Sequence, residues 1–262
     1  MWKLFKAKPL LSKSDSDFQF DTFEWLLKYF GGPHFYDGIQ LVLPTDKFFP
    51  AEIRSPHDAA EFTFQRVKDY SGLTGWPVVL EEQDADPNLL VAPTIAVQNS
   101  DISPAGTFRI DKNEKVRITY NPDIVSDPVK MVSVFSHELA HYLTATSPEP
   151  PPGGWENWEF ATDTCAIFLG FGIFQANSAF GFQQYTTPDS IGWSTSGVGY
   201  LSQRERCFAL AMFLKLKGIK PEVAYPYCDR NVKSYLKLAL NELESEDRIE
   251  KLKDVCLVQQ ST

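Results

Sequence analysis

The sequence predicts an α+β fold with a mixed N-terminal half and a mostly helical C-terminal half. Short β-rich runs lie between helical segments in the first half, whereas from Asp127 onward the apolar residues have helical spacing almost throughout. We therefore expect an α+β subdomain over residues 17–126 and a helical subdomain over residues 127–262. Because no repeat or long linker separates them, residues 17–262 are expected to form a single domain.

The first half is expected to hold two helices and several short strands. The helix that ends at Gly31 is expected to begin at Asp21, a residue type that commonly caps helices. Ser55 and Pro56 are typical of a helix start, and this second helix is expected to run to Tyr70. Strands are expected at residues 39–43, 76–80 and 93–97, with a hairpin at residues 108–120 that turns at residues 111–114.

The second half begins with an Asp-Pro pair, which opens a helix expected over residues 127–145. Apolar residues lie nearly all round this helix, so it is expected to be buried. A Pro/Gly-rich loop at residues 148–154 leads to another helix. Gly170 and Gly172 are expected either to end this helix or to let another backbone segment approach closely. The remaining helices are expected at residues 202–217, the first residues of which form a capping box, and at residues 229–244 and 247–255.

The composition argues against two classes of protein. The net charge of -9 argues against a nucleic-acid-binding protein that relies on a basic surface. No run approaches the roughly 20 apolar residues of a transmembrane segment.

Residues 1–16 are expected to form a flexible basic tail, either solvated or resting on an anionic membrane. The four widely spaced cysteines and the lack of an export signal favour reduced thiols and a cytoplasmic location.

The strongest indication of function is the His-Glu-x-x-His pattern at residues 137–141, in the middle of the buried helix. Histidines four residues apart project from the same helix face, so both imidazoles can reach one metal ion. Glu138 can instead take a proton from a water on that ion. Catalytic zinc usually has a third protein ligand. Glu156, Glu159 and Asp163 form an acidic stripe on the next helix, which a helical hairpin would turn toward the histidines.

An HExxH helix followed by a Glu-x-x-x-Asp helix resembles the gluzincin zinc metallopeptidases, of which thermolysin is the familiar example. The resemblance covers residues 120–165. It implies a zincin-like fold, one Zn²⁺ per chain, and hydrolysis of peptide bonds in a peptide or protein substrate. The zinc ligands that it implies are His137, His141 and Glu159.

The resemblance also implies roles for two further carboxylates. Glu138 would act as general base, and Asp163 would hydrogen-bond the outer nitrogen of a ligand histidine and fix its tautomer. Glu156 remains an alternative to Glu159 as the third ligand, because one helical turn separates them.

The sequence departs from the thermolysin-like pattern, since no histidine follows His141 to stabilise the oxyanion. A tyrosine or arginine would have to serve. The candidates are Tyr200, Arg204 and Arg206.

The family also implies that a substrate peptide pairs with an edge strand just before the zinc helix. The strand at residues 115–120 is the candidate, and the residues assigned to it are Arg117, Thr119 and Tyr120. An ordinary internal strand is the alternative interpretation.

Two other functions fit the same pattern. The chain could be a catalytically inactive peptidase-like module that binds or regulates a partner, or a zinc hydrolase that acts on non-peptide amides. The sequence leaves the substrate, the cleavage specificity, the choice between endo- and exopeptidase, and the oligomeric state open.

Overall fold

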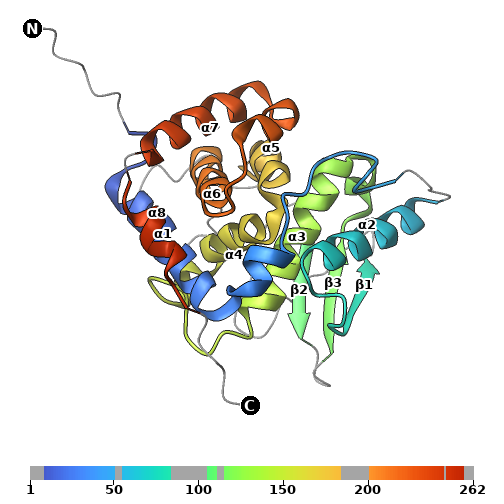
Figure 1. Ribbon diagram of the computed structural model, residues 1–262. Coiled ribbons are helices and arrows are strands. Elements are labelled where there is room, and N and C mark those ends of the chain that lie inside the picture. Colours follow the sequence, from blue (N-terminus) through green and yellow to red (C-terminus); the bar gives the residue numbers. More distant parts are fainter. Residues whose placement is uncertain are drawn as a thin grey trace, which may run out of the picture.

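A helical body flanks a small sheet in the computed structural model of the chain (Figure 1), which describes residues 9–50, 55–83, 105–110, 115–183, 201–244 and 246–256. The α-helices are α1 (Lys13–Phe30), α2 (Pro56–Tyr70), α3 (Pro128–Thr144), α4 (Trp158–Ala166), α5 (Gly172–Gln183), α6 (Gln203–Leu216), α7 (Arg230–Leu243) and α8 (Arg248–Lys253). The strands are β1 (Val78–Glu82), β2 (Gly106–Ile110) and β3 (Val116–Tyr120). The predicted α+β class is confirmed, because the described strands all precede α3 and the described elements after it are helices.

The sheet has the order β1-β3-β2, with β1 parallel and β2 antiparallel to β3. The predicted hairpin is confirmed, since Gly106 pairs with Tyr120 and Ile110 with Val116. The strand expected at residues 76–80 lies two residues later, at Val78–Glu82. The strand expected at residues 93–97 and the turn at residues 111–114 lie outside the described residues.

The strand expected at residues 39–43 does not form. Ile39, Leu41 and Val42 are buried in the core as their apolar character requires. However, the backbone N–H of Val42 donates to the carbonyl of Gly170, at 3.0 Å, rather than to a neighbouring strand. The segment is therefore an extended connection packed against helices, which hydrophobicity alone does not distinguish from a strand.

Several helix starts follow the capping residues in the sequence. The side chain of Ser55 accepts from the N–H of Asp58 at the start of α2. At the start of α6, Ser202 and Glu205 form the predicted capping box. The start of α1 was predicted wrongly at Asp21: Ser12 caps this helix, and residues 13–16 of the expected tail form its first turn. The rest of that tail, at residues 1–8, lies outside the described residues.

The helical path is interrupted at Gly170, within the glycine pair that was expected to end the helix. A π-helical turn (Ile167–Phe171) follows α4, and α5 begins at Gly172. Gly170 has φ 97°, which changes the direction of the chain between the two helices. A Cβ at this position would collide with the carbonyl oxygen of Gln40. Gly170 thus allows the connection at residues 39–43 to approach the helices closely.

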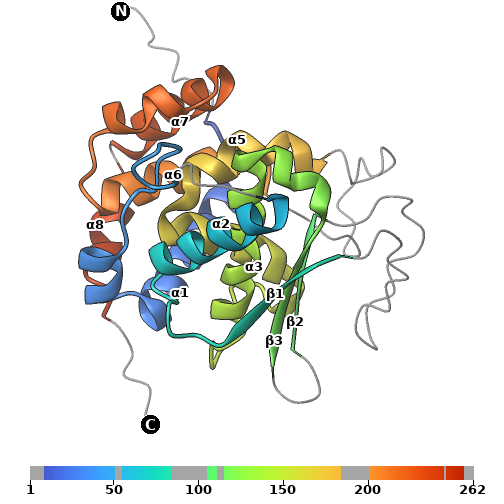
Figure 2. The same ribbon diagram turned by 90° about the vertical axis from the view of Figure 1, so that its right-hand side faces the viewer.

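Helix α3 lies between the sheet and the C-terminal helices, with α2 beside it (Figures 1 and 2), and it contacts β2, α2, α4 and α5. Buried apolar residues from Leu10 to Leu252 form one large core cluster around it. The two ends of the described chain also meet, since the N–H of Leu10 donates to Glu242 at 2.9 Å. Among the described residues, no helix is long and apolar enough to span a membrane.

Replacement of Gly170 by alanine is expected to lower the free energy of unfolding by more than about 1 kcal/mol, because alanine is strained at positive φ and its Cβ meets Gln40. Chemical denaturation monitored by circular dichroism measures this change. Gly75→Ala is the matched control, since a Cβ there has no neighbour within 4 Å. Equal midpoints for the two variants would contradict the close approach at Gly170.

Candidate metal centre

Helix α3 presents both histidines of the HExxH pattern on one buried face. The side chain of Asp127 caps the helix by accepting from the N–H of Lys130 at 3.0 Å. His137, Glu138 and His141 are 4%, 6% and 7% exposed. Polar side chains at this depth require partners. Their positions and contacts therefore indicate what the site can bind.

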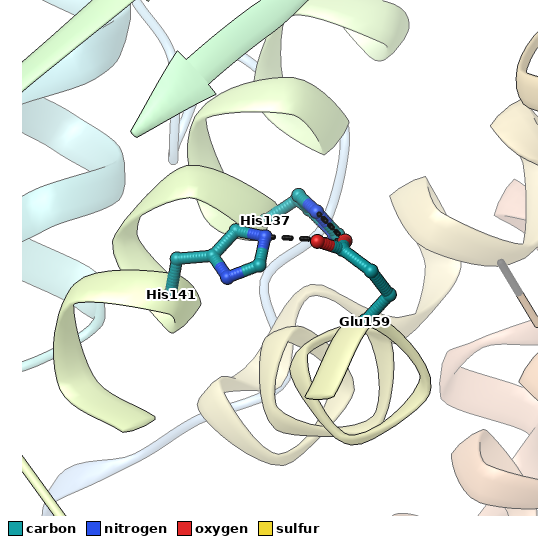
Figure 3. Close-up of side chains that lie close together, drawn as sticks. All are labelled: His137, His141 and Glu159. Carbon is teal, nitrogen blue, oxygen red and sulfur yellow. Dashed lines mark ion pairs between the residues drawn. The ribbon is translucent and has the colours of Figure 1, made fainter. Parts of the chain in front are cut away.

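The inner nitrogens of the two histidines converge on one carboxylate from α4 (Figure 3). Glu159 Oε2 lies 3.4 Å from His137 Nε2 and 3.2 Å from His141 Nε2. This oxygen is buried, yet it has no hydrogen bond of normal geometry to any residue that the structure describes. The three ligand atoms lie within 4.8 Å of one another, which is close enough for one metal ion to contact all three.

The outer nitrogens of both histidines have partners of their own. His137 Nδ1 lies 3.0 Å from Asp163 Oδ1, and His141 Nδ1 lies 3.2 Å from Thr162 Oγ1. A carboxylate oxygen can only accept, so Asp163 holds a proton on Nδ1 of His137 and turns Nε2 toward Glu159. This is the contact expected for Asp163. Thr162 was not predicted, although it lies beside Asp163 in the Glu-x-x-x-Asp segment.

The pKa values of this cluster are shifted in opposite directions. Burial would lower the pKa of His137, but its contacts with Asp163 and Glu159 outweigh burial and raise the pKa to about 10. Burial would raise the pKa of Glu159, but the two histidines hold it well below its usual range. Burial raises the pKa of Glu138, and the histidines only partly offset this effect. Strongly perturbed groups of this kind are typical of functional sites.

The structure distinguishes the two glutamates that sequence spacing left open as third ligands. Glu156 is exposed and lies in a 3₁₀ turn (Trp155–Asn157) before α4. Glu159, one turn later, faces the histidines and is the carboxylate of the three-residue cluster. The candidate third ligand is therefore Glu159.

The two arginines expected as candidate oxyanion stabilisers have other contacts in the structure. Arg206 is fully buried, and its guanidinium donates to Asp163 Oδ2 at 2.7 Å, on the side of Asp163 away from His137 Nδ1. Arg204 is exposed and stacks over the ring of Tyr235, at 5.3 Å. The contacts described for the two arginines are thus with Asp163 and Tyr235 rather than with the histidine nitrogens. Tyr200, the third candidate, lies outside the described residues.

The prediction that β3 receives a substrate peptide is also wrong. This strand lies at the centre of the sheet, so its backbone is already paired with both neighbours. The side chains of Arg117, Thr119 and Tyr120 contact Glu81, Thr107 and Glu82, respectively. The edge strand beside α3 is β2. A Cβ at Gly106 would lie 2.6 Å from Val134 and 3.0 Å from Glu138, so the glycine lets β2 pack directly on the helix.

Aromatic side chains enclose His141 on two sides. The ring of Phe108, from β2, stacks on the imidazole at 6.0 Å, and Trp158 meets it edge-on at 4.8 Å. The indole N–H of Trp158 donates to Thr144 at 2.8 Å, which fixes its orientation. These rings restrict the rotation of the imidazole and reduce contact with water. Sequence reasoning missed both residues, because apolar character alone does not indicate which side chains meet across elements.

Comparison with protein-family models, curated proteins and solved structures finds no match for this chain in any of the three. The candidate site therefore rests on its own geometry.

Replacement of Glu159 by alanine is expected to reduce the zinc content of the purified protein from about one ion per chain to a small fraction of that, since it removes one of three ligands. Elemental analysis after dialysis measures the content. Glu156→Ala is the matched control and is expected to retain zinc, because Glu156 is exposed outside the cluster. Equal zinc in wild type and Glu159→Ala would reject the assignment.

Proposed function

We propose that the protein is a zinc-dependent peptidase of zincin-like fold, with His137, His141 and Glu159 as metal ligands. The observation that carries the proposal is the convergence of two Nε2 atoms and one Oε2 atom, from two helices, on one point. Two imidazoles and one carboxylate are the protein ligands of zinc in the thermolysin type of catalytic site.

The chemistry of the donor set supports a metal ion at this point. Among the described residues, the buried Oε2 of Glu159 has no hydrogen bond of normal geometry, and a metal ion between it and the two histidines would satisfy it. Both outer histidine nitrogens are held by other groups, so both inner nitrogens are turned toward the proposed metal position. Three protein ligands leave a coordination position for water or substrate, as catalytic zinc requires.

Glu138 is the residue proposed to move protons. A bound zinc ion would polarise the scissile carbonyl and lower the pKa of water. Burial raises the pKa of Glu138, which brings this carboxylate closer to the range in which it can both accept and release a proton. We propose that Glu138 takes a proton from the attacking water and delivers it to the departing amine.

The edge strand β2 is proposed to bind the peptide backbone. It lies against α3 beside Glu138 and His141, with its second edge unpaired among the described strands. An extended peptide that adds to this edge would place a backbone carbonyl near the metal ligands. This arrangement favours a peptide or protein as substrate over a small amide.

A cytoplasmic location is part of the proposal. All four cysteines are free in the structure, and Cys165 and Cys207 are buried. Burial raises the pKa of both thiols above the usual value, so they remain protonated and unreactive. This use of cysteine is typical of a reducing compartment.

An inactive metal-binding module is the second candidate function. Its support is that Arg204 and Arg206, two of the candidates for the oxyanion, contact Tyr235 and Asp163 instead. Measurement of turnover on a peptide library beside simple amides separates the three functions. Cleavage of peptides supports the proposal, cleavage of amides alone indicates a non-peptide hydrolase, and zinc binding without turnover indicates the inactive module.

Replacement of Glu138 by glutamine is expected to lower kcat at least about 100-fold and to leave zinc content unchanged, because an amide side chain cannot accept the proton and position 138 supplies no metal ligand. Peptide hydrolysis and elemental analysis on the same preparation measure both effects. Wild-type turnover by the variant would reject the role of Glu138, and loss of zinc would show that the side chain holds the metal.

A further inference from the structure

The carboxylate of Asp163 is shared between the candidate metal centre and a buried arginine. Its Oδ1 accepts from Nδ1 of His137, at 3.0 Å. Its Oδ2 accepts from Arg206 at 2.7 Å and from the backbone N–H of Leu201 at 2.8 Å. The side chains of Asp163 and Arg206 are each only 1% exposed. The orientation of the carboxylate is thus set by protein groups alone.

Arg206 is held by partners on several sides. Its Nε donates to the carbonyl of Leu201 at 3.1 Å. Its Nη1 donates to the backbone carbonyl of Gln175 at 3.2 Å and to the side-chain oxygen of Gln175 at 2.5 Å. A guanidinium is planar and presents its donors in a fixed fork, so these bonds determine where Nη2 meets Asp163.

The network returns to the helix that carries the histidines. The side-chain nitrogen of Gln175, on α5, donates to the carbonyl of Ser133 at 2.8 Å and to Ser136 Oγ at 3.0 Å. Both serines lie on α3, and Ser136 immediately precedes His137. A chain of hydrogen bonds therefore runs from His137 through Asp163, Arg206 and Gln175 and returns to α3. It links α3, α4, α5 and α6.

We propose that Arg206 is a positioning residue for the metal centre, which acts through Asp163. It fixes Oδ2 of Asp163, so that Oδ1 faces His137 and keeps the Nε2 lone pair directed at the metal position. The inference rests on the proposed zinc site but not on peptidase activity. It requires that zinc affinity, and not only folding, depends on a side chain that contacts neither metal nor substrate.

Stability alone is a weak reason for this ion pair. The removal of two charges from water opposes folding, and well-packed apolar residues often replace a buried pair without loss. Partners that orient ligand histidines, by contrast, commonly change metal affinity about 10- to 100-fold when they are replaced. A role in orientation therefore predicts a measurable effect on zinc that a role in packing does not.

A double-mutant cycle on zinc affinity tests the proposal, with competition against a chromophoric chelator as the measurement. Asp163→Asn is expected to weaken zinc binding about 10- to 100-fold, and Arg206→Gln about 10-fold. The double variant is expected to bind zinc no more weakly than Asp163→Asn alone, because Arg206 acts only through that carboxylate. Additive losses, or Arg206→Gln within about twofold of wild type, would overturn the proposal.

Two further variants separate orientation from folding. Arg206→Lys keeps the charge but lacks the planar fork of donors, so it is expected to fold and to show an intermediate loss of zinc affinity. If Arg206→Gln does not fold, Arg206→Lys takes its place in the double-mutant cycle. Arg204→Gln, on the exposed side of the same helix, is the matched control and is expected to bind zinc as wild type does. A lysine variant that folds and binds zinc with wild-type affinity would reject the role of the fork.

The ring N–H proton of His137 in the zinc-loaded protein reports directly on its hydrogen bond to Asp163. Its NMR signal is expected far downfield in wild type, because Asp163 accepts this proton, and to shift upfield in Arg206→Lys. An unchanged signal would contradict the proposal. A wild type that binds no zinc is a separate result, which would reject the metal centre itself and this inference with it.

Discussion

The carboxylate of Asp163 is the contact on which the candidate site depends. It is buried between a histidine of α3, a guanidinium of α6 and a backbone N–H. A carboxylate in such surroundings is tolerated only when each oxygen has partners, so the helices that supply them must pack in one arrangement. The geometry of the histidines is therefore tied to the packing of the C-terminal helices.

Helix α3 has two roles, and both require that its side chains stay fixed in position. It forms the centre of the core, and it carries the residues proposed for chemistry. Because interiors are close-packed, its side chains cannot move freely, and the histidine nitrogens remain directed at one point. Gly106 lets the sheet approach this helix, and Gly170 lets a connecting segment approach the helices on the other side. Both glycines serve close packing around the site.

Parts of the fold and the site could be predicted because their causes are local. Helix caps such as Ser55 and Ser202 act within one turn, and the structure has helices where they indicated. The HExxH spacing places two histidines on one face of any helix, whatever surrounds it. Asp163 follows Glu159 by four residues, so the same argument brings both to the face that meets α3.

The sequence by itself determined the α+β class, most helix starts and the two histidines of the candidate metal centre. Only the tertiary structure decided that Glu159 rather than Glu156 faces the histidines, that β3 is central, and that Arg206 lies behind Asp163. Each of these depends on how separate elements pack, and Arg206 and Asp163 are 43 residues apart. Periodicity and capping reflect forces within one element, whereas partners across elements are set by close packing and the burial of charge.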